Sequence, residues 1–217
     1  MNISIIGDSI STYTGYNPEG YKVYYDAERR RANGLTSVND TWWMRVINGL
    51  GGSLCVNNSF SGSLVSGDSF PAGCCAERTG GLHTDTARPD IILVYAGVND
   101  CGWQVPVKGR KTDSFRGAYA KMLRDVHANY PDARIICGTL MKRYARGSGK
   151  PDEFTGAACE PYSDVIRRCS RLRGCSLAEL SETRYETLDW LHPTARGHAE
   201  MALVWLGALK DILQGEK

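Results

Sequence analysis

The chain has 217 residues, of which 42% are hydrophobic and 23% are charged. This composition suits a packed core and argues against disorder, so we expect residues 1–217 to form a single domain. The net charge is +2, and the longest basic run is Arg29-Arg30-Arg31. We therefore expect no nucleic-acid partner.

The sequence carries no apolar stretch that approaches the ~20 residues of a membrane span. Met1 is followed almost at once by an apolar run, without the basic segment and cleavage site of a signal peptide. These features predict a cytoplasmic protein with no membrane span.

Eight cysteines are present, and none forms a Cys-x-x-Cys pair that would indicate a structural zinc site. Buried free thiols are the expectation for a chain of this kind. The neighbouring pair Cys74-Cys75, in a glycine-rich segment, leaves open a redox or oligomerisation role.

Apolar runs that predict strands occur at residues 3–6, 54–56, 91–96, 134–140 and 175–177. The run at 91–96 is continuously apolar, which is typical of a parallel strand covered on both faces. Helical patterns lie between the runs and predict helices over residues 42–50, 115–126 and 162–172. Residues 11–39 and 143–156 have no such pattern and are predicted to be long loops.

A further helix is predicted from Pro193-Thr194 onward, with one apolar stripe to pack on a sheet. The stripe comprises His198, Met201, Ala202, Trp205, Leu209, Ile212 and Leu213. Strands that alternate with helices predict a three-layer α/β/α fold with a parallel sheet.

Two polar motifs directly follow predicted strands. Gly7-Asp8-Ser9 follows the first strand, and Gly97-Val98-Asn99-Asp100 follows the strand at 91–96. Each is also an ordinary turn sequence. The carboxyl ends of parallel strands meet at one edge of a sheet, so Ser9 is expected near Asn99, whose side-chain amide can donate to an oxyanion.

A third motif, Asp189-Trp190-Leu191-His192, precedes the last helix. In a helical turn, residues three apart share a face, so Asp189 can fix the tautomer of His192. His83 and His127 have no carboxylate at this spacing, and His198 belongs to the apolar stripe. His192 is therefore the candidate base for Ser9.

The Gly-x-Ser-x-Gly elbow is absent, as are the zinc-protease, P-loop and dinucleotide motifs. The three motifs in this order resemble the blocks of the SGNH (GDSL) hydrolase family. The resemblance implies a flavodoxin-like sheet of five parallel strands in the order 2-1-3-4-5. It also implies Ser9, His192 and Asp189 as the catalytic triad, without a metal or cofactor.

The same resemblance implies an oxyanion hole formed by the Ser9 and Gly62 N–H groups and the Asn99 amide. Gly62 is the best match to the second block of the family, within Asn58-Ser59-Phe60-Ser61-Gly62. The implied activity is hydrolysis of a small-molecule ester through an acyl-enzyme.

Aromatic residues concentrate after Ser9 and beside the other motifs. Candidates for substrate contact are Tyr13, Tyr16, Trp103 and Trp190. Aromatic faces suit sugars, which favours a short-acyl, in particular acetyl, esterase acting on carbohydrates, but the same rings suit packing of a long loop. The oligomeric state is left open.

Three alternatives remain. A lysophospholipase or thioesterase would use the same triad on another acyl group. A metal-dependent phosphoesterase would gather Asp8, Asp100, Asp189 and His192 around cations. A non-catalytic sugar-binding protein would need the aromatic loop alone.

Overall fold

The computed structural model describes residues 1–145 and 153–214. A five-stranded sheet has the order β2-β1-β3-β4-β6, and every neighbouring pair is parallel. Its strands are β1 (Asn2–Gly7), β2 (Ser53–Ser59), β3 (Ile91–Tyr95), β4 (Arg134–Gly138) and β6 (Ser176–Ala178). Counted within this sheet, the order is the 2-1-3-4-5 that the family resemblance implies.

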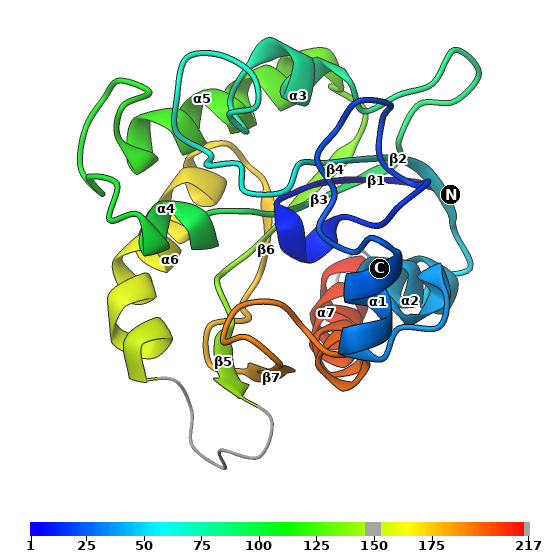
Figure 1. Cartoon of the computed structure of the whole chain (residues 1–217). Helices are drawn as coiled ribbons and strands as arrows, with labels where there is room; N and C mark the ends of the chain where they lie inside the picture. Colours follow the sequence, from blue (N-terminus) through cyan, green and yellow to red (C-terminus); the bar gives the residue numbers. More distant parts are fainter. Residues whose placement is uncertain (146–152, 215–217) are drawn as a thin grey trace.

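Helices cover both faces of the sheet, as the three-layer prediction requires (Figure 1). One face carries α1 (Ala27–Asn33), α2 (Trp42–Gly49) and α7 (Ala195–Gln214), and the other carries α3 (Ala76–Gly80), α5 (Phe115–Asn129) and α6 (Glu153–Leu172). The short α4 (Val98–Gly102) lies where β3 ends.

The central strand β3 contributes to two cores because its side chains alternate between the faces. Ile92 and Val94 pack with α5 and α6, whereas Leu93 and Tyr95 pack with α2 and α7. The buried part of the α7 stripe joins the second core through Met201, Trp205 and Leu209, and His198 of the same stripe is also buried. Residues 212 and 213 of the predicted stripe lie outside the described side chains.

Local side chains fix where the helices begin. Thr41 accepts a hydrogen bond from the Met44 N–H at the start of α2, and Ser114 accepts one from the Gly117 N–H at the start of α5. These N-caps satisfy donors that the first turn leaves free. Thr41 and Ser114 are therefore the N-caps that fix the starts of α2 and α5.

The predicted loop over residues 11–39 was only partly correct, because this segment also forms 3₁₀ and α structure. A 3₁₀ turn, η1 (Ser9–Ser11), follows β1 directly, and η2 (Val38–Asp40) precedes α2. Between them Asp26 caps α1, whose carboxyl end is closed by Gly34 in the left-handed region.

The predicted loop over residues 143–156 was also wrong at both ends. A second, two-stranded parallel sheet pairs β5 (Lys142–Ala145) with β7 (Arg184–Thr187). The helix predicted from residue 162 begins at Glu153 and continues through Pro161. Residues 146–152 of the predicted loop lie outside the described residues.

A disulfide corrects the expectation that all cysteines are free thiols. Cys101 of α4 and Cys159 of α6 are bonded, with Cα atoms 5.6 Å apart. Cys74 and Cys75 are free and buried. Structural disulfides are typical of oxidising compartments. This bond therefore does not favour the cytoplasmic location, which stays a prediction.

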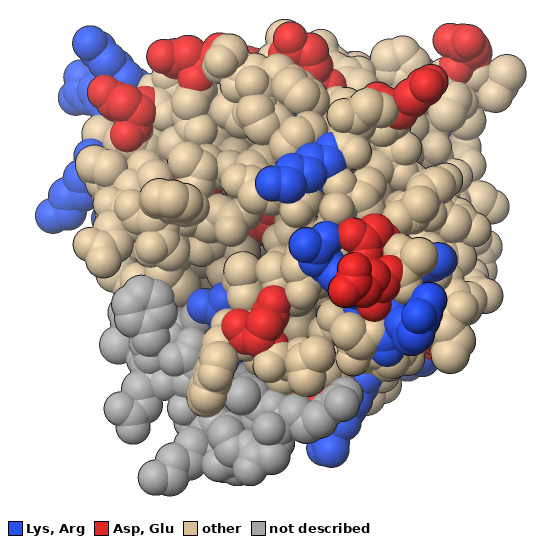
Figure 2. Space-filling view, in the orientation of Figure 1, with Lys and Arg blue, Asp and Glu red and all other residues tan. Residues whose placement is uncertain are grey.

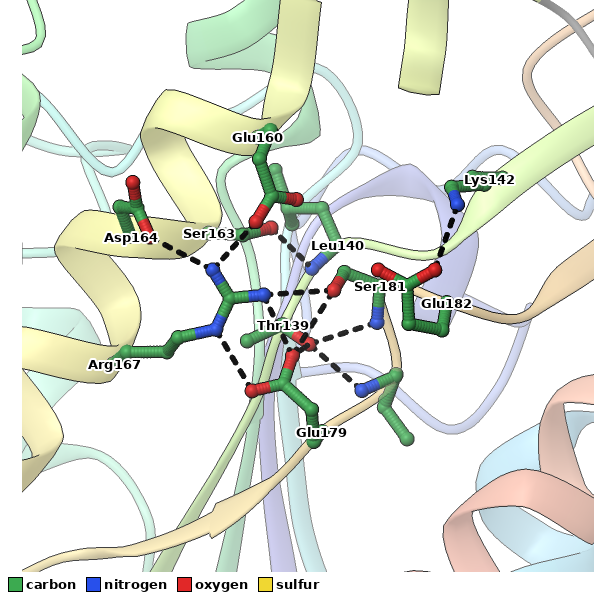
Figure 3. Close-up of polar contacts among 11 residues, drawn as sticks. Thr139, Leu140, Lys142, Glu160, Ser163, Asp164, Arg167, Glu179, Ser181 and Glu182 are labelled. Carbon is green, nitrogen blue, oxygen red and sulfur yellow. Dashed lines mark hydrogen bonds and ion pairs between the residues drawn. The ribbon is translucent and has the colours of Figure 1, made fainter. Parts of the chain in front are cut away.

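Charged side chains tie α6 to the segment that follows β6 (Figure 3). Arg167 forms ion pairs with Glu160 and Asp164 on its own helix and with Glu179 beyond β6. Thr139, after β4, donates to Glu179 and accepts from the N–H groups of residues 180 and 181. This network anchors the chain that continues into β7 and residues 188–194.

Over the described helices, we find none with both the length and the apolar character that crossing a bilayer requires.

Candidate active site

Ser9 is the first residue of η1, two residues beyond the end of β1. The turn is fixed by Asp8, whose carboxylate accepts from the Ile10 N–H at 3.0 Å. Thr12 donates through its hydroxyl to the Ser9 carbonyl at 2.9 Å. These bonds hold the serine hydroxyl at the carboxyl edge of the sheet, where ligands of open α/β folds bind.

Ser9, His192 and Asp189 form a hydrogen-bonded chain. The distance between His192 Nε2 and Ser9 Oγ is 2.9 Å, and that between His192 Nδ1 and Asp189 Oδ2 is 2.6 Å. With Nδ1 protonated toward the carboxylate, Nε2 is free to take the serine proton. The structure thus brings together the three residues that the sequence predicts to act together.

Backbone donors fix the carboxylate of this chain. Asp189 Oδ1 accepts from the N–H groups of Leu191 and His192, at 3.1 and 2.7 Å. Burial alone would raise the pKa of Asp189, but the hydrogen bonds from His192 and the backbone outweigh it and hold that pKa below its ordinary value. The carboxylate therefore stays ionised.

Burial lowers the pKa of His192 below 6.5, although its hydrogen bond with Asp189 and the charge of that carboxylate act in the opposite direction. A neutral imidazole at pH 7 can act as a base.

Three donors predicted for an oxyanion hole lie on three successive strand ends. Within the described part of the chain, no group accepts from the backbone N–H of Ser9 or of Gly62. Asn99 Nδ2 donates to the Ser63 carbonyl at 2.9 Å. Because an amide carries two N–H groups, the second is available to a ligand. Gly62 has a φ of +81°, a conformation that favours glycine.

Asp100 holds the segment that contains Gly62 against α4. Its carboxylate is fully buried and accepts from the Val65 N–H, the Ser66 N–H and the Ser66 hydroxyl. Asp100 therefore holds in place the segment whose Ser63 carbonyl accepts from the neighbouring Asn99 side chain. Gly97, which precedes α4, lies close to α5, since at its φ of +124° a Cβ would lie 2.8 Å from the Phe115 ring.

A buried cation lies beneath the site. Arg78 is fully buried and donates to the carbonyl oxygens of Gly7, Asn58 and Pro71, at 2.6, 3.1 and 2.8 Å. Burial lowers the pKa of Arg78 to about 10. Arg78 therefore joins the strand end before Ser9 to the strand end before Gly62.

Comparison with protein families identifies the fold and its chemistry. The family model for GDSL-like lipases and acylhydrolases matches residues 1–143. The chain belongs to this family. It is therefore a hydrolase that acts on ester bonds, and the matched residues include Ser9, Gly62 and Asn99.

Solved structures resemble this GDSL-like hydrolase over nearly its whole length. A protein from Bacteroides uniformis described as a GDSL-like lipase is 27% identical, with a TM-score of 0.72 over 96% of this chain and 95% of its own. One from Bacteroides ovatus with the same description is 24% identical, with a TM-score of 0.71 over 99% and 98%. A sequence comparison with curated proteins finds no match.

A more distant structural relative acts on carbohydrates. The carbohydrate esterase family 2 enzyme from Corynascus thermopiles, which carries a carbohydrate-binding domain, is 20% identical, with a TM-score of 0.63. The similarity covers 98% of this chain and 66% of that one.

The four predicted substrate contacts of the GDSL-like hydrolase lie in different surroundings. Tyr13 is buried, and its hydroxyl accepts from Arg30. The Tyr16 ring packs between Tyr13 and Trp43. Trp103 and Trp190 are exposed, and Trp190 has a φ of +66°. A non-glycine residue in this region is strained, which is common at functional sites.

Two residues of the site, Tyr24 and Arg78, were not indicated by the sequence. Tyr24 packs on His192 and binds Asp189, although 165 residues separate it from that aspartate. Arg78 lies in a short helix without a motif. Tyr24 lies in the aromatic-rich segment after Ser9, which also contains Tyr13, Tyr16, Tyr21 and Tyr25, but nothing in its spacing distinguishes it from those tyrosines.

The acids of the phosphoesterase alternative do not gather. Among the described residues, no group of three or more His, Cys, Asp or Glu side chains could hold a metal ion. The Asp100 carboxylate instead accepts from backbone N–H groups, and the Asp8 carboxylate accepts from the Ile10 N–H.

Proposed function

We propose that this GDSL-like hydrolase is a serine esterase that cleaves short acyl esters, in particular acetyl esters of carbohydrates, with Ser9 as the nucleophile. The observation that carries the proposal is the pair of hydrogen bonds from His192, 2.9 Å to Ser9 Oγ and 2.6 Å to Asp189 Oδ2. A serine becomes a nucleophile when a base takes its proton and a third group orients that base.

In the proposed reaction, His192 takes the hydroxyl proton as Ser9 Oγ bonds to the ester carbonyl carbon. Asp189 stabilises the imidazolium that forms. The negative charge on the carbonyl oxygen is held by the N–H groups of Ser9 and Gly62 and by the Asn99 amide. His192 then protonates the leaving alcohol as the carbon–oxygen bond breaks, which leaves an acyl group on Ser9.

Water completes the cycle by the same route. His192 removes a proton from water as the water oxygen attacks the acyl-enzyme, and then returns a proton to Ser9 as the acid leaves. Asp189 remains a carboxylate throughout because its pKa is held below the ordinary range.

Access to the nucleophile supports a short acyl group. Ser9 is 3% exposed and His192 is 8% exposed, so little of the reacting hydroxyl is open to solvent, which favours a small acyl group.

An exposed aromatic ring near the site supports a sugar as the alcohol. In the orientation of Figure 1, charged side chains of both signs lie near the middle of the face as well as at its rim, so charge alone does not select the alcohol (Figure 2). The exposed ring of Trp103, four residues beyond Asn99, offers an aromatic face of the kind that sugars stack on. The resemblance to a family 2 carbohydrate esterase points the same way.

The test is a series of aryl esters with two to twelve acyl carbons, assayed beside a panel of acetylated sugars. We expect kcat/KM to be highest for acetyl and to fall steadily with chain length, with acetate released from at least one sugar. A preference for eight carbons or more would contradict the acetyl assignment and favour a lysophospholipase. A preference for thioesters over the matching oxygen esters would favour a thioesterase.

A further inference from the structure

Tyr24 makes two different contacts with the proposed triad. Its ring stacks on the His192 imidazole, with centroids 3.3 Å apart and planes 9° from parallel. Its hydroxyl donates to Asp189 Oδ2 at 3.0 Å. Burial and then the charge of Asp189 raise the pKa of Tyr24 to about 12, so the hydroxyl keeps its proton and remains a donor.

The position of Tyr24 is itself fixed by the fold. Its backbone N–H donates to the Thr12 hydroxyl at 2.9 Å, and Thr12 in turn donates to the Ser9 carbonyl. Its carbonyl accepts from the N–H of Asp26, the cap of α1. The ring is thus tied to the same turn that carries the nucleophile.

One carboxylate oxygen receives both donors. Asp189 Oδ2 accepts from His192 Nδ1 and from the Tyr24 hydroxyl, whereas Oδ1 accepts from two backbone N–H groups. The hydroxyl therefore fixes the direction of Oδ2, and the stacked ring restricts rotation of the imidazole out of its plane. The Tyr24 hydroxyl thus constrains the Asp189 carboxylate, and the Tyr24 ring constrains the His192 imidazole.

We propose that Tyr24 is a positioning residue, which holds the His192 imidazole and the Asp189 carboxylate in the geometry needed for proton transfer from Ser9. Its effect on turnover rests on the proposed function, but its effect on the imidazole does not. Tyr24 acts through His192 and Asp189 rather than by contact with the ester.

The structure also sets the direction of the electrostatic effect. A hydroxyl on Oδ2 shares the carboxylate charge and so weakens its stabilisation of an imidazolium. Loss of the hydroxyl is therefore expected to raise the pKa of His192. The charged and titratable groups around that imidazole are Asp189, Tyr24, Tyr25, Arg29 of α1, Arg143 of β5 and His198 of α7.

Two substitutions separate the ring from the hydroxyl. Tyr24→Phe keeps the stacked ring and removes the donor, whereas Tyr24→Leu removes both. Tyr21→Phe is the matched control, because it removes a hydroxyl from the same segment on a ring that packs against Phe60 and Phe70 rather than the triad.

For Tyr24→Phe we expect the acid limb of the kcat/KM profile to move up by about half a pH unit, with kcat within about threefold. For Tyr24→Leu we expect kcat to fall about 10- to 100-fold while KM changes less than about twofold, because misplacement of a base costs rate rather than binding. Tyr21→Phe should match the unsubstituted enzyme in both respects.

Proton NMR of the His192 ring tests the same claim without turnover. The chain has four histidines, so a His192→Gln variant assigns the signal. We expect the Nδ1 proton to give a sharp downfield resonance in the unsubstituted protein and in Tyr24→Phe, and an exchange-broadened one in Tyr24→Leu. This readout holds even if the chain cleaves none of the esters assayed.

An unchanged resonance and an unchanged kcat in Tyr24→Leu would overturn the proposal. A rise in KM alone would also overturn it, since that result assigns Tyr24 to substrate contact. If Tyr24→Leu does not fold by circular dichroism, the His192 titration in Tyr24→Phe decides, and a midpoint equal to that of Tyr21→Phe would refute the role of the hydroxyl.

Discussion

Replacement of Arg78 by methionine tests whether this buried cation holds the site together. Arg78 donates to carbonyl oxygens of Gly7, Asn58 and Pro71, which belong to three separate segments. Methionine has a similar length and no donor, so the substitution leaves three carbonyl groups without this partner.

The magnitude follows from these bonds. Hydrogen bonds from a charged donor contribute about 1.5–3 kcal/mol each, so three give about 5–9 kcal/mol. Removing the cation also relieves the cost of its burial, and the lowering of its pKa from 12.5 to about 10 corresponds to about 3 kcal/mol. The net expectation is a loss of about 2–6 kcal/mol of unfolding free energy.

The assay is urea unfolding followed by circular dichroism, with kcat measured on the folded fraction. Arg88→Met is the control, because Arg88 is exposed and binds a single carbonyl, that of Asn129. We expect Arg88→Met to cost less than about 1 kcal/mol. A loss in Arg78→Met no larger than that in Arg88→Met would refute the reasoning, as would an unchanged kcat, because the Gly7 carbonyl lies two residues before Ser9.

Three further results are expected. Asn99→Ala should lower kcat about 10²- to 10³-fold with circular dichroism unchanged, and a loss under about threefold would remove Asn99 from the oxyanion hole. The kcat/KM profile should rise as His192 loses its proton, with a midpoint below 6.5 because burial lowers that pKa; a midpoint above 7 would contradict this. Burial raises the pKa of Asp8 to about 7, although the hydrogen bond from the Ile10 N–H lowers it in part. Between about pH 4 and pH 7 the folded state therefore holds a proton on Asp8 that the unfolded state has released. Stability should therefore fall as pH rises from about 4 to 7, and Asp8→Asn should recover up to about 4 kcal/mol at pH 8 and little at pH 4, as measured by urea unfolding. A difference that does not depend on pH would refute the shift.

Short-range patterns predicted the framework of the site. Ser9 and Asn99 follow apolar runs, and the ends of parallel strands meet at one edge, so their proximity needed no knowledge of the loops. Asp189 and His192 lie three residues apart, and the bond between them is local. The contact of that pair with Ser9 spans 183 residues; the spacing of Asp189 and His192 made His192 the candidate base, and the family resemblance joined all three residues into one triad.

Contacts between distant, unpatterned segments were not predictable. Tyr24 is one of five tyrosines in its segment, and its stacking on His192 depends on how the chain before α1 folds back over the site. The bond between Cys101 and Cys159 joins residues 58 apart without a characteristic spacing.

Weak local signals caused the remaining errors. The residues of β5 and β7 are polar and few, so their pairing is decided by tertiary contacts rather than by an apolar pattern. The helix predicted from residue 162 begins earlier, at Glu153, and continues through Pro161, a residue that ordinarily disfavours a helix interior.

Labelling with a serine-directed phosphonate tests the central claim most directly. We predict one phosphonate per chain on the peptide that contains Ser9, identified by mass spectrometry, with esterase activity lost in proportion to labelling. Ser9→Ala should be folded, unlabelled and inactive. Labelling of another residue, or esterase activity retained in Ser9→Ala, would contradict the account.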